Sequence, residues 1–407
     1  MATQRSTANG GTAWRCLALG QGGTGLLKQG VHVTSFGFVS SYPPTRCGLA
    51  TFTESLATAI AGGGVDESRV VRVLDEPSSA SEGRFSTRSV IAELVGGDSA
   101  SMESSVRALN GLDIVVVQHE YGIYGGPDGA EAIVLLAALT APTIVVLHTV
   151  LTEPTDGQRG VLERIVALAT SVVVMTEAAH DILSRRFDVD MSKVSVIPHG
   201  FASSLGALER KALPGKRVLT WGLIGPGKGL EWGIRAMAEL RDLDAEYLIV
   251  GKTHPKVVLH EGEAYRERLE GIVAELDLAD RVTFVDTYPN RDELADLVSS
   301  ADVVLLPYDS RVQVTSGVLV EAVSAGKPVV STGFPHAVEL LASGAGIIVE
   351  HESPGSIAGA LREVLQHEDR AAAMAESALR VTFDASWADI AERYRVLAAS
   401  ILAVRAA

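Results

Sequence analysis

The chain has 407 residues, of which 47% are hydrophobic and 40 are glycines, and a formal net charge of −15. This length exceeds one ordinary domain and favours two. The acidic balance argues against a nucleic-acid partner, whose phosphates need a basic face. It also disfavours an anionic membrane surface, although a local basic face would still permit peripheral membrane contact.

Two cysteines, Cys16 and Cys47, are too few for a disulfide framework, and no Cys/His cluster has metal-ligand spacing. We therefore expect a cytoplasmic protein that needs neither a metal nor another cofactor. Residues 1–30 are rich in Gly, Thr, Ser and Gln without periodicity, which predicts a disordered tail. Its apolar segment CLALG is too short for the core of a signal peptide.

The first predicted domain covers residues 31–201. Short runs rich in Val and Ile, bounded by turn residues, predict strands within 31–39, 70–74, 114–118, 143–149, 171–176 and 193–199, with a helix over 52–61. Residues 31–200 hold 11 Lys and Arg against 20 Asp and Glu, a net charge of −9. The apolar stretch from Ala132 to Leu147 is divided by Thr140 and Pro142, so it predicts a helix followed by a strand and no integral membrane segment.

The second predicted domain covers residues 217–385 and follows a linker at 202–216. Strands are expected within 217–224, 246–251, 281–286, 302–308, 327–332 and 346–350, and helices within 232–241, 265–278, 291–301 and 318–325. This alternation predicts an α/β protein with two doubly wound parallel sheets. The last segment, 386–407, reads as one amphipathic helix.

Ligands of open parallel sheets bind beyond the carboxyl ends of the strands, so residues that follow strands are the candidates. Gly222 ends one strand, and a Gly/Pro loop leads to Lys228 at the start of a helix, an arrangement that suits a diphosphate. An ordinary turn with a solvated lysine is the alternative. The spacing matches neither G-x-G-x-x-G nor a complete Walker A motif.

Two further candidate segments lie in the first domain. The loop SSYPPTRCG carries Arg46 and ends at Gly48, just before a helix, so it is a second candidate phosphate-facing loop. His119 and Glu120 come at the end of a buried strand, and His148 has the same placement after the next strand. A structural role is the alternative for each histidine.

The fourth segment is VTSGVLVEAVSAGKPVVS, residues 314–331. Ser316 and Gly317 open a short helix that is apolar except for Glu321. A buried, unpaired carboxylate is costly, so Glu321 needs a partner. The carboxylate is placed to accept hydrogen bonds from two neighbouring hydroxyls, as on a ribose. Pairing with a buried Arg or Lys is the alternative.

Together these four segments resemble the GT-B fold glycosyltransferases, most closely retaining glycosyltransferase family 4, also called glycosyl transferases group 1. The resemblance covers roughly residues 32–400. Its most specific part is the sequence from Glu321 to Val330, which fits the second glutamate and the following Ala-x-x-x-Gly-x-Pro-Val-Val of the family. The resemblance implies two Rossmann-like domains whose parallel sheets face a central cleft, with the last helix crossing back to the first domain.

The resemblance also implies roles for individual residues. Glu321 would hold the ribose of a nucleoside-diphosphate sugar, and the backbone from Thr315 to Val318 would meet its sugar and diphosphate. The implied catalytic residues are His119, Lys228 and Gln313; the implied donor-binding residues are Gly48, Gly222, Lys228, Gln313, Thr315, Ser316, Gly317, Val318 and Glu321; the acceptor side would hold Arg46, Glu120 and His148.

This chain departs from the family pattern at two positions. The first glutamate of the family pair falls on Gln313, which carries no charge, and the arginine that usually follows the strand glycine falls on Leu223. Leu223 removes one of two cations from the diphosphate, for which Arg46 is a candidate replacement. The departures bear on how the leaving group is stabilised.

The function implied is retaining transfer of a sugar, without a metal, from a UDP- or GDP-sugar to a hydroxyl of a saccharide or small glycoside. A nucleotide-sugar epimerase or a phosphorylase of the same fold is an alternative, although no pyridoxal-phosphate lysine is identifiable. A nucleotide-sugar-binding protein without turnover is a third possibility. The acceptor, the base, the linkage and the oligomeric state are left open by the sequence.

Overall fold

The computed structural model describes residues 33–64, 66–77, 89–201, 215–382 and 384–406. Val33–Ala407 forms one compact unit. The expected tail with Cys16 and most of the expected linker lie outside the described residues.

Seven parallel strands form the first sheet, in the order β3-β2-β1-β4-β5-β6-β7. They are β1 Ser35–Ser40, β2 Glu67–Leu74, β3 Val90–Val95, β4 Ile114–His119, β5 Thr143–Leu147, β6 Ser171–Val174 and β7 Val194–Val196. Ile114 and Val116 of β4 contribute to the core on one face of the sheet, and Val115 and Val117 to the core on the other. Burial on both faces explains why the strands are continuous apolar runs.

Helices cover both faces of the first sheet. They are α1 Gly48–Ala61, α2 Ser99–Leu109, α3 Glu131–Ala138, α4 Asp156–Leu168 and α5 Glu177–Arg186, with single 3-10 turns at Pro127–Gly129 and Met191–Lys193. The predicted break in the apolar stretch is confirmed, because α3 ends at Ala138 and β5 begins at Thr143. Strand β3 was not predicted, since its sequence VIAELV includes a glutamate that pairs with the buried Arg72 of β2.

Six parallel strands form the second sheet, in the order β10-β9-β8-β11-β12-β13. They are β8 Lys216–Trp221, β9 Ala245–Val250, β10 Val282–Val285, β11 Val303–Leu306, β12 Val329–Thr332 and β13 Gly346–Val349. All six were predicted. Lys216, expected as the last linker residue, is already part of β8.

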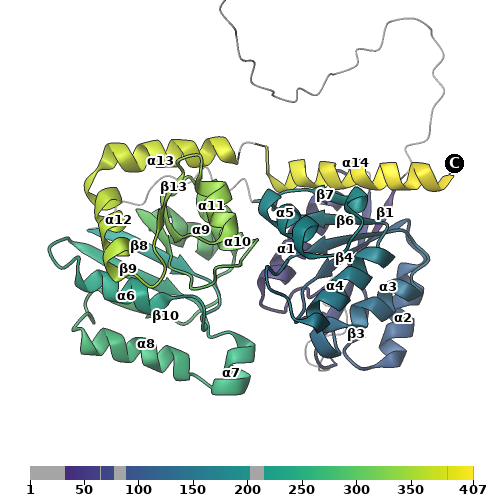
Figure 1. Cartoon of the computed structure of the whole chain (residues 1–407), viewed down its shortest axis with the longest axis horizontal. Helices are drawn as coiled ribbons and strands as arrows, with labels where there is room; N and C mark the ends of the chain where they lie inside the picture. The colour runs from purple at the N-terminus through teal and green to yellow at the C-terminus, as the bar shows by residue number, and fades with distance from the viewer. Residues whose placement is uncertain (1–32, 65, 78–88, 202–214, 383, 407) are drawn as a thin grey trace, which may run out of the picture. The chain divides into compact units, whose positions relative to one another are not determined.

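The helices of the second half are α6 Leu230–Ala238, α7 Pro255–Glu261, α8 Ala264–Glu275, α9 Arg291–Ser300, α10 Gly317–Ser324, α11 Pro335–Leu341, α12 Pro354–Gln366, α13 Glu368–Val381 and α14 Trp387–Ala406. Figure 1 shows helices on both sides of the second sheet. The predicted α/β class with two doubly wound parallel sheets is confirmed.

Each sheet has a point at which its strand order reverses. In the first sheet this point lies between β1 and β4, and in the second between β8 and β11. At such a point the loops after the two strands diverge to opposite faces and leave room for a ligand. Three of the four candidate segments directly follow β1, β4 and β8, and the fourth follows β11.

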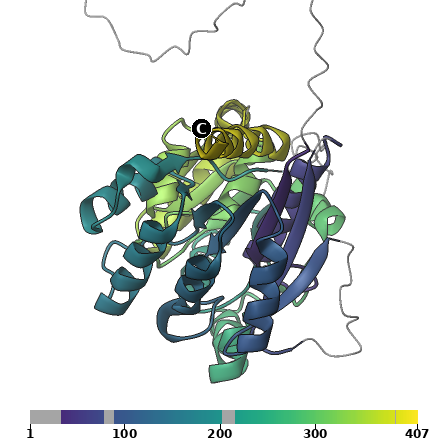
Figure 2. The ribbon, with the colours of Figure 1, turned by 90° about the vertical axis from the view of Figure 1, so that its right-hand side faces the viewer.

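The last helix, α14, packs against the layer of the first sheet. Ile390 and Tyr394 are buried in the same core as Phe36 of β1 and Phe52 of α1. Trp387 donates its backbone N–H to Phe201, and its ring fills the space where a Cβ on Gly200 would lie. Figures 1 and 2 both show this yellow helix beside the purple and blue elements of the first sheet.

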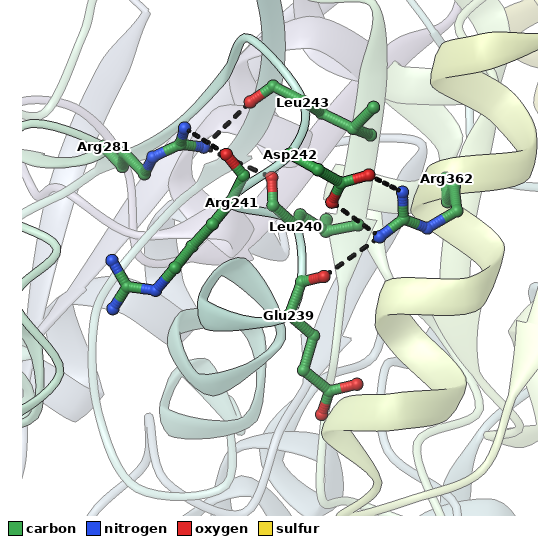
Figure 3. Close-up of polar contacts among 7 residues, drawn as sticks. All are labelled: Glu239, Leu240, Arg241, Asp242, Leu243, Arg281 and Arg362. Carbon is green, nitrogen blue, oxygen red and sulfur yellow. Dashed lines mark hydrogen bonds and ion pairs between the residues drawn. The ribbon is translucent and has the colours of Figure 1, made fainter.

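Two arginines hold the C-terminal end of α6, where helix carbonyls lack intrahelical partners. Arg281 donates to the carbonyl oxygens of Leu240, Arg241 and Leu243, at 3.3, 2.9 and 2.9 Å. Arg362 of α12 donates to the Glu239 carbonyl at 3.0 Å and to both carboxylate oxygens of Asp242 (Figure 3). These bonds anchor the turn that connects α6 to β9.

Candidate active site

The loop between β8 and α6 depends on glycine at two positions. Gly222 has φ +116 and directly follows β8. Gly229 has φ +57 and is the N-cap of α6, and a Cβ at this residue would lie 1.9 Å from the carbonyl oxygen of Pro307. Only glycine combines these backbone angles with such close approach. The loop is therefore seated directly on the segment that follows β11.

Lys228 lies in this loop, and its Nζ is 4.2 Å from the centre of the Tyr308 ring. The backbone N–H of Asp309 donates to the Gly227 carbonyl at 3.0 Å, which ties the two loops together. Among the described residues, no carboxylate lies within ion-pair distance of the Lys228 ammonium. The charge of Lys228 is thus held in place but not neutralised.

Helix α10 presents free amides at its N-terminus. The Ser316 hydroxyl accepts from the Leu319 N–H at 3.3 Å, and the Ser316 N–H donates to His336 Nδ1 at 2.9 Å. The amides of Gly317 and Val318 have no hydrogen-bond partner in the described part of the chain. Two free N–H groups at the positive end of a helix dipole suit an anionic group such as a phosphate.

Glu321, one turn into α10, accepts a hydrogen bond at 3.2 Å from the indole Nε1 of Trp221, the last residue of β8. The expected alternative, pairing with a buried cation, is not found within the described residues, where no Lys or Arg is within 4 Å. Burial raises the pKa of Glu321 to about 7, although the Trp221 hydrogen bond and the charge of Arg291 lower it. The carboxylate therefore titrates near neutral pH.

The segment before α10 is held by one hydrogen bond within itself and by one from Thr176, the N-cap of α5. Gln313 Nε2 donates to the Thr315 carbonyl at 2.9 Å, and the Val314 carbonyl accepts from the Thr176 hydroxyl at 3.1 Å. The hydroxyl of Thr315 is buried and has no partner in the described part of the chain. An orphaned buried hydroxyl costs about 1–3 kcal/mol, so a ligand atom that paired with it would be stabilising.

Unpartnered polar groups also collect at the reversal point of the first sheet. His119 ends β4 and is fully buried, yet neither ring nitrogen has a partner among the described residues. The Ser40 hydroxyl at the end of β1 and Gln118 Nε2 are also buried without a hydrogen-bond partner among the described residues. Burial lowers the pKa of His119 to about 4, so the ring is neutral at pH 7 and offers one donor and one acceptor.

The other two candidates on this side are engaged within the chain. His148 Nε2 lies 2.7 Å from Gln118 Oε1, and its ring meets Phe52 edge-on at 4.8 Å. Glu120 accepts hydrogen bonds from the Tyr121 N–H and the Thr149 hydroxyl. Burial lowers the pKa of His148 to about 3 and raises that of Glu120. Both side chains are thus bonded within the chain, and their acceptor-side role stays a prediction.

Gly48 is the first residue of α1, and Cys47 is its N-cap, with the thiol accepting from the Ala50 N–H at 3.4 Å. No atom lies within 4 Å of a Cβ placed on Gly48, so this helix end borders open space. Arg46 precedes it and forms no hydrogen bond or ion pair with the described residues. Its role as a replacement cation stays a prediction.

Residues that sequence reasoning missed complete the arrangement. His199 follows β7, and its Nε2 would lie 3.3 Å from a Cβ on Gly317; burial lowers its pKa to about 4. The signal that singled out His119, a histidine at the carboxyl end of a predicted strand, applies to His199 as well. Trp221, Tyr308 and His336 carry no such signal, because their partners lie 100, 80 and 20 residues away in the sequence.

The structure thus groups the candidates that follow β8 and β11 around α10, and it brings His199, which follows β7, against the start of the same helix. Trp221 donates a hydrogen bond to Glu321, and the Lys228 ammonium lies over the ring of Tyr308. A Cβ placed on Gly222 would lie 3.6 Å from the side chain of Val318. No group of three or more His, Cys, Asp or Glu in the described ranges is arranged to hold a metal ion. None of the helices in those ranges combines the length and apolar character needed to cross a membrane.

Comparison with known structures identifies this architecture. The chain is similar to a glycosyltransferase from Rickettsia africae ESF-5, with a TM-score of 0.72 at 14% identity over 91% of this chain and 99% of the other. It is similar also to Anabaena Alr3699/HepE in complex with UDP, with a TM-score of 0.71 at 17% identity over 90% and 100%. These likenesses show the GT-B fold.

Sequence comparison points the same way. The D-inositol 3-phosphate glycosyltransferase of Mycolicibacterium vanbaalenii is 32% identical over 50% of this chain and 47% of its own length, and that of Stackebrandtia nassauensis is 28% identical over 56% and 54%. The chain spans about half the length of the curated relatives it matches. Residues 209–381 match the family model of glycosyl transferases group 1. The predicted GT-B fold is confirmed, and the second half of the chain is similar to the glycosyl transferases group 1 family over residues 209–381.

Proposed function

We propose that the protein is a retaining glycosyltransferase that moves a sugar from a nucleoside-diphosphate sugar to a hydroxyl of a saccharide or small glycoside. The observation that carries this proposal is the arrangement around α10. A carboxylate held by Trp221, two free helix amides and the Lys228 ammonium lie at the reversal point of the second sheet. The carboxylate suits the diol of a ribose, the two amides suit one phosphate, and the ammonium suits a second phosphate.

The chemistry follows from where charge develops. The bond between the anomeric carbon and the β-phosphate oxygen breaks, and its electron pair stays on the diphosphate. Lys228 and the amides of Gly317 and Val318 stabilise that charge as it forms. The acceptor oxygen bonds to the anomeric carbon, and its proton passes to the leaving phosphate oxygen or to solvent. Retention of the configuration at the anomeric carbon is part of the proposal and is inferred from the resemblance to the family.

The first-domain residues suit a role beside the transferred sugar. The His119 ring is buried, neutral and unpartnered in the described part of the chain, so it can hydrogen-bond a sugar hydroxyl without adding charge. Gln313 takes the place of a family glutamate, and its Nε2 is already bonded to Thr315. Its carbonyl oxygen is left to accept from a sugar hydroxyl, with no carboxylate charge.

Relatives and neighbours narrow the substrates to be tested. A similar structure holds UDP, which makes UDP-sugars the first donors to try, followed by GDP-sugars. The similar D-inositol 3-phosphate glycosyltransferases suggest that phosphorylated cyclitols belong in the acceptor panel beside free saccharides and glycosides. The acidic first domain favours a soluble acceptor over a lipid.

The test begins with thermal melting in UDP, GDP and ADP on the wild type, Glu321→Ala and the near-isosteric Glu321→Gln. A nucleotide at 100 times its Kd stabilises by about 2.7 kcal/mol, which shifts Tm by a few degrees. The proposal expects one nucleotide to shift the wild type and both variants to lose most of that shift. The selected sugar nucleotide is then incubated with the acceptor panel, and the anomeric configuration of the product is read by NMR.

Three outcomes separate the alternatives. Transfer with a retained anomeric centre supports the proposal. Conversion of the sugar nucleotide alone to an epimer supports a nucleotide-sugar epimerase. Tight binding without turnover on any acceptor supports a donor-binding protein, for which the substitutions at Gln313 and Leu223 are the motivating observation. Absence of a shift by any nucleotide at millimolar concentration overturns the donor-site assignment.

A further inference from the structure

We infer that Tyr308 is the positioning residue for Lys228, and that its ring holds the ammonium where the diphosphate of the donor binds. This inference rests on the proposed function, since it concerns the diphosphate of the donor. The Lys228 Nζ lies 4.2 Å from the centre of the Tyr308 ring, well within the range of a cation–π contact. Tyr308 follows β11 and Lys228 follows β8, the two strands at the reversal point.

A ring holds an ammonium in a way that a carboxylate cannot. A carboxylate would neutralise Lys228 and compete with phosphate for its N–H groups. The face of an aromatic ring attracts the cation through its quadrupole but leaves the full charge and the donors available. Asp309, the carboxylate that follows Tyr308, is engaged elsewhere, since its Oδ1 accepts from Trp232 Nε1 at 2.8 Å.

The Tyr308 ring is itself fixed. It is 1% exposed and stacks on Phe334, with ring centres 5.4 Å apart and an angle of 18° between the planes. Its backbone carbonyl accepts from the Thr332 hydroxyl at 2.6 Å and lies 3.0 Å from His351 Nδ1. Three neighbouring elements therefore determine where the ring face points.

The backbone around Lys228 is held by the same segment that carries Tyr308. Gly229 packs against the Pro307 carbonyl, and the Asp309 N–H bonds to Gly227. Residues 227–229 and 307–309 thus form one interlocked pair of loops. Lysine side chains lose much rotamer freedom when they bind a ligand. A lysine already held over a ring loses less, so it binds a diphosphate more strongly than a solvated lysine would.

The experiment measures binding of the nucleoside diphosphate chosen by the melting screen, of its parent nucleoside and of inorganic pyrophosphate to the full chain. The variants are Tyr308→Leu, Tyr308→Phe, Lys228→Ala and the double variant Tyr308→Leu/Lys228→Ala. Tyr308→Leu should weaken nucleoside diphosphate and pyrophosphate by about 3- to 30-fold and leave the nucleoside unchanged. Tyr308→Phe, which keeps the ring, should retain most of the wild-type affinity.

The double variant decides whether the ring acts through the lysine. If it does, Tyr308→Leu costs little in the Lys228→Ala background, because the two losses are not additive. Equal loss of nucleoside and diphosphate, or an undiminished loss without Lys228, would mean that Tyr308 only supports the fold and would overturn the inference. If Tyr308→Leu binds the nucleoside diphosphate with wild-type affinity, the inference is also overturned, but the proposed function is unaffected. A wild type that binds neither nucleotide nor pyrophosphate overturns both.

A second measurement does not need a donor. Lys228 is observed as a ¹³C-dimethylated lysine by NMR, assigned from its absence in Lys228→Arg. The ring face should shift its methyl resonance upfield in the wild type and in Tyr308→Phe. The shift should disappear in Tyr308→Leu. An unshifted resonance in a folded wild type contradicts the contact.

Discussion

The indole N–H of Trp221 donates to Glu321 across 3.2 Å and joins the end of β8 to the first turns of α10. The bond fixes one carboxylate oxygen of Glu321 and turns the group toward the loop that carries Gly222 and Lys228. Because indole can only donate, it favours the ionised carboxylate, in opposition to burial. A pKa of about 7 is the balance between these effects.

Nucleotide binding should therefore release protons near neutral pH. A ribose diol donates two hydrogen bonds and is held best by the ionised form of Glu321, so binding lowers the pKa from about 7. At pH 7 we expect release of about half a proton per site and a weaker affinity as the pH falls from 8 to 6. Calorimetry in Pipes and in Tris, which differ in ionisation enthalpy, measures the release, and Glu321→Gln should show none.

Removal of the indole donor should destabilise the protein most at high pH. Trp221→Phe leaves the Glu321 carboxylate without that partner, which costs about 1–3 kcal/mol of unfolding free energy. The folded pKa of Glu321 is already raised above its usual 4.5, so stability from this group is present below pH 4.5 and is lost as the pH rises through about 7. Urea unfolding at pH 6 and pH 8.5 should show the larger penalty at pH 8.5. In the Glu321→Gln background this pH dependence of the penalty should vanish; its persistence would assign the effect to packing.

The histidines should make the protein sensitive to acid. Burial lowers the pKa of His119 and His199 to about 4 and of His148 and His336 to about 3. Their contribution to stability is complete above pH 6.5 and is lost as the pH falls toward those values, by up to about 1.4 kcal/mol per pH unit for each histidine. His148→Gln, which can still pair with Gln118, should reduce the slope of unfolding free energy against pH between 6 and 4.5. An unchanged slope would show that His148 is already protonated in the fold.

Two glycines of one loop offer a matched test of backbone constraint. Gly227 has φ +86 with no atom near a Cβ, whereas Gly229 has φ +57 and a Cβ there would clash with the Pro307 carbonyl. Gly227→Ala should cost about 1 kcal/mol from backbone strain alone, and Gly229→Ala should cost several times more. Urea unfolding measures both. Similar costs for the two variants would show that the loops after β8 and β11 are not packed as tightly as described.

The strands of both sheets were largely predictable because burial on two faces leaves an unmistakable apolar run. Strand β3 was an exception, since Glu93 interrupts its apolar run and pairs with Arg72 on the neighbouring strand. Helices α7, α11, α12 and α13 were not predicted, and their sequences are short or rich in alanine and polar residues. Helix α12 nevertheless carries a helical apolar pattern, since Ile357, Leu361, Val364 and Leu365 are buried on one face, and the sequence reading missed it.

For each contact in the candidate site, the sequence predicted one of the two residues and missed its partner. The chemistry of Glu321 and Lys228 and their places after strands were visible in the sequence. Their partners Trp221 and Tyr308 were not, because a tryptophan or tyrosine at a strand end is ordinary until the fold brings the loops together. For the same reason the sequence could not show that Glu120 and His148 are bonded to Thr149 and Gln118.

The substitution at Leu223 leads to a prediction about gain of function. Leu223 follows Gly222 at the end of β8 and is partly exposed, so an arginine there would place a guanidinium beside the diphosphate loop. Leu223→Arg should tighten nucleoside diphosphate binding by about tenfold, the usual value of one hydrogen bond to a charged group. Leu223→Gln, which is polar but neutral, should give little gain. The gain should shrink as salt is raised from 50 to 500 mM, because exposed charge is screened.

A Leu223→Arg variant that binds no more tightly would show where the second positive charge for the diphosphate comes from. If Leu223→Arg does not tighten binding, the diphosphate already has its second cation from another element. Arg46, which precedes α1 and forms no hydrogen bond or ion pair with the described residues, is the residue to test next. Arg46→Ala should then weaken nucleoside diphosphate and leave nucleoside unchanged. If Leu223→Arg restores what Arg46→Ala removes, the two positions supply the same charge, and the loss of the family arginine has been offset from the opposite sheet.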